Sequence, residues 1–101
     1  MAHGEYKTPG GKLVVVDATI ADHTLQQVMI SGDFFLYPDE ALEPMTASLE
    51  GLDISLDQKT ITALIEASIP EGTEVLGTSA EGIAIAVRRA VDASTQEATS
   101  V

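Results

Sequence analysis

Alternating apolar residues in the first third of the chain predict a β-hairpin. Over residues 12–20 the apolar side chains that share one face at a period of two are Val14, Val16, Ala18 and Ile20. Residues 25–31 continue the pattern with Val28 and Ile30 on a common face, and residues 21–23 interrupt it as a turn would. The two strands are expected to pair antiparallel, with one face of the sheet buried.

A shorter strand before this hairpin would complete a three-stranded meander. Residues 5–7 favour an extended segment, and Pro9, Gly10 and Gly11 after them favour a turn, because proline fixes φ and glycine permits positive φ. After the hairpin, residues 34–37 carry large apolar groups toward the point where the sheet is expected to meet the helices.

The middle of the chain has the spacing of helices. Pro44 would cost about 3 kcal/mol in a helix interior, so it is expected in the first turn of a helix, with residues 39–43 forming a separate turn. Ser55 and Gln58 have the spacing of a capping box, and Pro70 would end the helix that follows. The apolar stripe of that helix is Ile61, Leu64, Ile65 and Ile69.

A final helix is expected after Ser79, which can cap it. Its apolar residues recur at intervals of four: Ile83, Val87 and Val91. Arg88 and Arg89 are expected near its end, where they would complement the helix dipole. Residues 1–91 are therefore expected to form a single α+β domain, and residues 92–101 a mobile C-terminal tail.

Composition narrows the possible functions. A chain of 101 residues with 45% hydrophobic residues fits one small soluble domain. The formal net charge of −11 argues against nucleic acid and anionic membranes as partners, because both require cationic groups on the protein. Most of the acidic residues are expected to form a solvated surface, and adaptation to high salt is an alternative reason for them.

The absence of cysteine excludes several kinds of chemistry. With no Cys, disulfides, thiolate nucleophiles, Cys-ligated zinc and iron-sulfur clusters are all excluded. The N-terminal residues lack the apolar core of a signal peptide, and no segment approaches the roughly 18 apolar residues of a membrane span. A cytoplasmic location is expected.

One turn carries candidate binding chemistry. Residues 8–12 read TPGGK, and Lys7 and Lys12 flank the glycines Gly10 and Gly11. Glycines let backbone N–H groups approach an anion, which indicates a phosphate site. A strand follows the glycines, however, whereas the P-loop and dinucleotide motifs require a helix there. A plain hairpin turn remains the alternative.

Other residue groups favour surface or packing roles. The acidic residues Asp33, Asp39, Glu40 and Glu43 lack the spacing of a calcium-binding loop, and a solvated rim is the expected role. His3 and His23 have no companion Cys, so no metal site is predicted. No Ser or Thr can be given a base and an orienting partner, so no catalytic residue is predicted.

The aromatic residues of the same region have two possible roles. Phe34, Phe35 and Tyr37 are expected to pack in the core and at its edge, and part of an interface is the alternative.

Two segments together resemble a known family. They are YKTPGGKLVVVD at residues 6–17 and ISGDFFLYPDEALEPM at residues 30–45, and a weaker likeness continues through residues 69–91. This order of motifs resembles the C-terminal accessory domain of bacterial and archaeal lipoate-protein ligases. Two residues depart from the family pattern. Pro44 stands where the family usually has good helix formers, and Gly82 lies in a first helical turn that is usually acidic. These departures put the helix boundaries in question.

The resemblance implies both a fold and a function. The implied fold is a three-stranded antiparallel β-meander packed against two to three helices, similar to the sulfur-acceptor and iron-sulfur scaffold fold. The implied function is that of an accessory subunit of a bipartite lipoate-protein ligase, which forms lipoyl-AMP from lipoate and ATP before transfer to a lysine of a lipoyl domain. The chain, with its own start Met, is expected to be the separate small subunit and not to be catalytic alone.

The resemblance also implies partners and site residues. ATP, magnesium and lipoate would be used by the complex, with none bound by this chain alone, and the partner would be the catalytic subunit, which in turn modifies lipoyl-domain proteins. Lys7, Gly10, Gly11 and Lys12 would lie near the phosphates of the adenylate. The residues expected to dock on the partner are Asp33, Phe34, Phe35 and Tyr37. A small-ligand or protein-binding module of the same fold, not catalytic, is the alternative.

Overall fold

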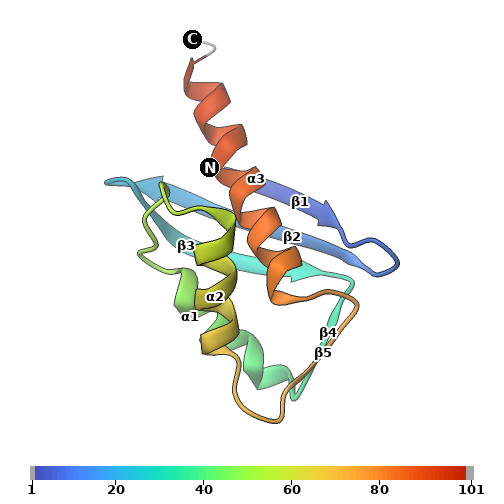
Figure 1. Cartoon of the computed structure of the whole chain (residues 1–101). Helices are drawn as coiled ribbons and strands as arrows, with labels where there is room; N and C mark the ends of the chain where they lie inside the picture. Colours follow the sequence, from blue (N-terminus) through green and yellow to red (C-terminus); the bar gives the residue numbers. More distant parts are fainter. Residues whose placement is uncertain (1, 100–101) are drawn as a thin grey trace.

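A three-stranded antiparallel sheet forms one layer of the molecule, and helices form the other (Figure 1). The computed structural model describes residues 2–99. The strands lie in the order β1 (Ala2–Lys7), β2 (Leu13–Ala21) and β3 (Thr24–Gly32), each paired with the next along the chain. The α+β class and the three-stranded meander predicted from the sequence are confirmed.

The hairpin between β2 and β3 contains a β-bulge that the alternation of the sequence does not reveal. Asp17 pairs with Met29 but Thr19 pairs with Gln26, so β3 has one more residue than β2 in this interval. Gln27 lies in the bulge and adopts a positive φ of 54°. Leu25 and Val28 are three positions apart and would face opposite sides of a regular strand. The bulge between them allows both side chains to be buried in the core.

Glu50 stabilises this bulge. Its carboxylate accepts hydrogen bonds from the backbone N–H of Val28 at 2.6 Å and of Gln27 at 3.2 Å. Glu50 follows the last residue of helix α1 (Leu42–Leu49). The carboxylate therefore satisfies two backbone donors on the outer edge of the sheet and connects α1 to that edge.

Two short elements lead from the sheet into α1. Strand β4 (Phe35–Tyr37) is followed by the 3₁₀ helix η1 (Asp39–Ala41). Pro44 lies in the first turn of α1, where a missing N–H costs no helical hydrogen bond. The predicted place of this proline is confirmed. The separate turn before it is shorter than the predicted 39–43, because Leu42 and Glu43 already belong to α1.

Helix α2 (Gln58–Ser68) ends before Pro70 as predicted, but its cap is a different residue. The Asp57 side chain accepts a hydrogen bond from the Thr60 N–H at 2.8 Å, which also lowers the pKa of this carboxyl. The Ser55 hydroxyl instead donates to Asp53 at 2.7 Å. The capping box predicted at Ser55 is therefore wrong, because an acidic cap lies two residues further along.

The interior lies between the sheet and the helices. Helix α3 (Ala80–Thr99) packs on β1 and β2, α1 packs on β3, and α2 packs against both of these helices. Gly4 of β1 lies directly against α3, so closely that a Cβ there would overlap the backbone of Ala86 and Ala90.

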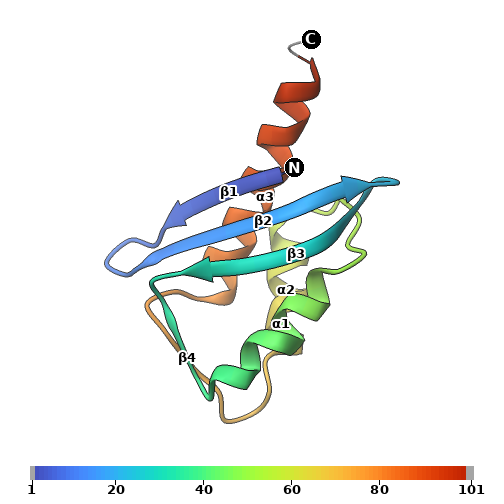
Figure 2. The same ribbon diagram turned by 180° about the vertical axis from the view of Figure 1, so that it is seen from behind.

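Figure 2 shows the opposite face of the sheet, which no described helix covers. No helix within residues 2–99 is long and apolar enough to cross a membrane.

Helix α3 extends beyond the end predicted for it. Ser79 caps it as expected, since its Oγ accepts from the Gly82 N–H at 3.2 Å. The helix continues to Thr99, so Arg88 and Arg89 lie in its middle and not at its end. The segment expected as a mobile tail is helical through this point, because its Ala, Gln and Glu residues allow a helix already started on the core to continue. Residues 100–101 lie outside the described part.

Candidate functional site

The predicted lysine turn connects β1 to β2 and is held by hydrogen bonds of its own backbone. The Gly11 N–H donates to the Thr8 carbonyl at 2.8 Å, and the Thr8 N–H donates to the Lys12 carbonyl at 3.1 Å. Lys12 N–H donates to the carbonyl of Gly77 at 2.7 Å. These amides already have acceptors, so an anion at this turn would be met mainly by the ammonium groups of Lys7 and Lys12, which are exposed.

The turn lies against the segment that leads into α3. The Thr8 and Thr78 hydroxyls are hydrogen bonded at 2.9 Å. A Cβ added to Gly11 would overlap the carbonyl oxygen of Gly77, whereas a Cβ added to Gly10 would meet no atom within 4 Å. Gly11 is therefore required by a close backbone contact, and Gly10 by its positive φ of 69°.

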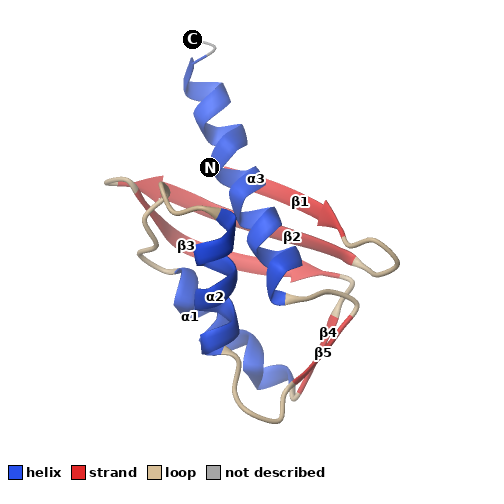
Figure 3. Cartoon of the chain, in the orientation of Figure 1, coloured by secondary structure: helices blue, strands red, loops and turns tan. Residues whose placement is uncertain are grey.

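Strands β4 and β5 (Glu74–Leu76) form a two-stranded antiparallel ribbon beside the main sheet (Figure 3). Phe35 pairs with Leu76, and Tyr37 pairs with Glu74. Because side chains alternate along a strand, Leu36 is buried while its neighbours are exposed, Phe35 by 67% and Tyr37 by 73%. Leu76 is exposed by 51%. We call Phe35, Tyr37 and Leu76 the ribbon face.

The structure brings the two predicted groups of site residues together. The Asp33 N–H donates to the carbonyl of Leu13 at 3.0 Å, next to Lys12. Gly77 lies between the groups, because a Cβ there would meet Lys12 Cγ at 2.6 Å and Phe34 Cα at 3.5 Å. The lysine turn and the ribbon face are therefore neighbouring parts of one end of the molecule.

The predicted interface residues differ in exposure, and the ribbon adds another candidate. Phe34 is half-buried and packs against the core, whereas Phe35 and Tyr37 are exposed. Leu76 was not predicted because a single leucine in a short segment carries no periodic signal. Only its pairing with Phe35 places it on the same surface.

The two arginines are engaged within the fold. Arg88 donates from Nη1 to the carbonyl of Ile54 at 2.6 Å and from Nη2 to Asp92 at 2.9 Å. Arg89 lies 5.0 Å from the centre of the Tyr6 ring and donates to the carbonyl of Glu5. These contacts assign both arginines a structural role and leave lysines as the cations at the site.

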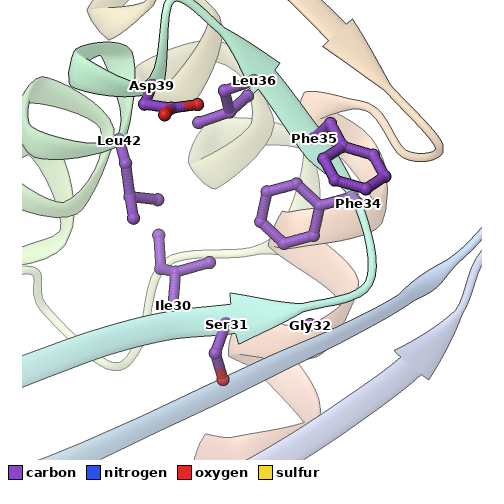
Figure 4. Close-up of a pocket in the computed structure, with 8 residues that line it drawn as sticks. All are labelled: Ile30, Ser31, Gly32, Phe34, Phe35, Leu36, Asp39 and Leu42. Atoms are coloured by element: carbon purple, nitrogen blue, oxygen red, sulfur yellow. The ribbon is translucent and has the colours of Figure 1, made fainter.

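A cleft of about 210 Å³ lies on the inner side of the ribbon, between β3, β4 and α1 (Figure 4). Figure 4 shows the Phe34 ring and Leu42 directed toward it, while Ser31 points away. Asp39 supplies the charged group of the lining. The full lining is Ile30, Ser31, Gly32, Phe34, Phe35, Leu36, Asp39 and Leu42.

His3 forms a charged cluster on the uncovered face of the sheet. Its Nδ1 lies 2.5 Å from Asp17 Oδ1, and its Nε2 lies 2.7 Å from Glu5 Oε2. These hydrogen bonds, with Asp17 first, raise the pKa of His3 above its ordinary value of 6.5. Among the residues that the structure describes, no group of three or more His, Asp or Glu side chains could hold a metal ion.

This cluster predicts a pH dependence of stability. A raised pKa in the folded state means that the folded protein binds the His3 proton more tightly than the unfolded chain does. The stabilisation is fully present below about pH 6.5, the unfolded pKa, and is lost as pH rises through the folded pKa. A His3→Gln variant should lose this part of the pH dependence of thermal unfolding. A His3 pKa at or below 6.5 in an NMR titration would contradict the assignment.

Comparison with known proteins supports the fold. The chain is similar to a chain in the solved structure of an archaeal lipoylation system from Thermoplasma acidophilum, a bi-partite lipoate protein ligase and its E2 lipoyl domain. The TM-score is 0.65 at 23% sequence identity, and the match covers 86% of this chain and 91% of that chain. No protein-family model and no curated protein matches the sequence. At this identity the likeness establishes a shared fold.

Proposed function

We propose that this chain is the accessory subunit of a bipartite lipoate-protein ligase. With a catalytic subunit it would support the ATP-dependent activation of lipoate to lipoyl-AMP, before transfer to a lysine of a lipoyl domain. The observation that carries the proposal is the match to the archaeal bipartite ligase system over most of both chains. The order of sequence motifs at residues 6–17 and 30–45 supports it independently.

The arrangement of the site is consistent with a lid on another protein's active site. An exposed apolar ribbon face provides a surface for docking, and the neighbouring Lys7 and Lys12 can place positive charge beside phosphate groups. A lid of this kind would exclude water from a hydrolysable adenylate. The chain itself supplies no assigned nucleophile or general base, so catalysis is proposed to reside in the complex.

The substrates and cofactors of the reaction are assigned to the complex. ATP, lipoate and magnesium would be bound mainly by the catalytic subunit, in the cytoplasm. The residues at the lysine turn do not fit a magnesium ion, because an ammonium group has no lone pair to offer a cation. No step of the reaction is therefore assigned to a metal held by this chain.

A binding module of the same fold is the second candidate. The internal hydrogen bonds of the lysine turn favour it, since Gly11 and Lys12 amides that already have acceptors need no anion to satisfy them. In that case the ribbon face would contact a protein or ligand outside lipoate metabolism.

Pyrophosphate release distinguishes the two candidates. The matching catalytic subunit would be assayed with ATP and lipoate, with and without this chain, at low and high salt. If this chain is the accessory subunit, the rate of pyrophosphate release should be roughly a hundredfold or more higher with the chain than without it, as for a lid that completes an active site. If the folded catalytic subunit releases pyrophosphate at the same rate without this chain, the binding module becomes the better assignment.

Replacing Lys12 by methionine tests the role of its charge. Lys12→Met keeps the aliphatic stem that packs over Gly77 and removes the ammonium group. Pyrophosphate release by the saturated pair is expected to fall by about tenfold, with a further loss when Lys7 is changed too. Lys59→Met, at the exposed start of α2, removes the same charge and should leave the rate unchanged. Equal rates for both variants would assign the turn a structural role alone.

A further inference from the structure

The cleft behind the ribbon face is lined mainly by apolar side chains. Ile30 and Leu36 are buried at its base, while Phe34 and Leu42 are half-buried around it (Figure 4). The volume of about 210 Å³ lies below the range of roughly 300 to 1,000 Å³ that is usual for small-molecule sites. Its size suits a protruding side chain better than a separate ligand.

The charged side chain that lines the cleft is acidic. Asp39 lines the cleft, and the exposed Asp33, Glu40 and Glu43 occur in the same segment of chain. The ion pairs of the described residues involve His3 and Arg88, which leaves Asp39 without an ion-pair partner in residues 2–99. Neither a lysine nor an arginine lines the cleft. A group that enters it would be favoured by an accompanying positive charge.

We infer that this cleft receives an apolar side chain of the catalytic subunit, next to a lysine or arginine of that subunit which pairs with Asp39. The inference rests on the proposed function and names the contact through which the two subunits recognise each other. The cleft adjoins the ribbon face through Phe35, which belongs to both. An anchor in a pocket, surrounded by a charged rim, is the usual arrangement of a specific interface.

Three substitutions in this chain test the cleft. Leu42→Trp is expected to fill the space, and Asp39→Lys to reverse the charge at its lining. Titration calorimetry with the matching catalytic subunit should show complexes weakened by about tenfold or more for each variant at low salt. Asp39→Asn should weaken binding less and make it less sensitive to salt than the wild type.

Glu66→Lys is the matched control. Glu66 lies on α2 beside a different hollow, and its replacement makes the same change in net charge, from −11 to −9, as Asp39→Lys does. Its affinity for the catalytic subunit should remain within about twofold of the wild type, as for a charge outside the contact. Circular dichroism of each variant would establish that it keeps the native fold.

The outcomes separate this inference from the proposed function. If the wild-type chain neither binds nor stimulates the catalytic subunit, the proposed function fails and the inference fails with it. If the wild type binds and folded Asp39→Lys and Leu42→Trp bind as tightly as Glu66→Lys, the inference alone is overturned. Self-association of the isolated chain that Leu42→Trp abolishes would assign the cleft to a second copy and also overturn it.

Discussion

Gly4→Val is expected to abolish cooperative folding or to lower the free energy of unfolding by about 4 kcal/mol or more. Gly4 lies where β1 and α3 are in contact, and an added Cβ would overlap the carbonyl oxygen of Ala86 and the amide nitrogen of Ala90. Both are backbone atoms inside a helix, so neither can rotate aside as a side chain can. The helix would have to lift from the sheet, and urea unfolding followed by circular dichroism would measure the loss.

Gly10→Ala is the control for this prediction. A Cβ on Gly10 meets no atom within 4 Å, and only its φ of 69° opposes the substitution. The expected cost is about 1 to 2 kcal/mol, from the strain of a left-handed conformation. A Gly4→Val chain that unfolds at the same urea concentration as Gly10→Ala would show that α3 is not held against β1 as described.

Phe35→Asp is expected to reduce pyrophosphate release by the reconstituted pair about a hundredfold at a fixed, subsaturating concentration of this chain. The substitution places a charge at the centre of the ribbon face, where an aromatic side chain would otherwise be covered by the partner. Because Phe35 is largely exposed in the isolated chain, the thermal unfolding midpoint should change little. The rate and the midpoint together separate a docking defect from unfolding.

Leu64→Asp provides the comparison. Leu64 is also a large apolar side chain that is exposed, by 41%, but it lies on α2. Its replacement should therefore leave the rate of pyrophosphate release unchanged. If Leu64→Asp lost activity and Phe35→Asp did not, docking would have to be assigned to α2. Full activity of both variants would mean that the partner binds another face.

Regular patterns in the sequence predicted the elements that rely on one buried face. The alternation at Val14, Val16 and Ala18 is confirmed because these residues face the core from an uninterrupted strand. The periodic apolar residues of α3 are buried for the same reason. In the stripe predicted for α2, Ile61 and Ile65 are buried, whereas Leu64 is exposed by 41% and Ile69 is half-buried just beyond the end of the helix.

Features that depend on distant contacts could not be predicted in this way. The β4–β5 pairing joins segments that lie far apart in the sequence, and neither is long enough to show a period. In the sequence the lysine turn and the aromatic segment are separate features. Their proximity depends on Gly77, which the sequence presents as an ordinary loop glycine. The cleft at Leu42 likewise depends on how α1 packs beside β3.

The carboxylate of Glu50 also affects how the protein can assemble. An unprotected outer strand invites another chain to add a strand by backbone pairing, which is a common route to aggregation. Here Glu50 occupies the donors of Gln27 and Val28, and residues 52–53 pair with Thr24 and Leu25, so that much of this margin of β3 is already used within the chain. Addition of a strand along residues 24–28 of β3 is thereby disfavoured.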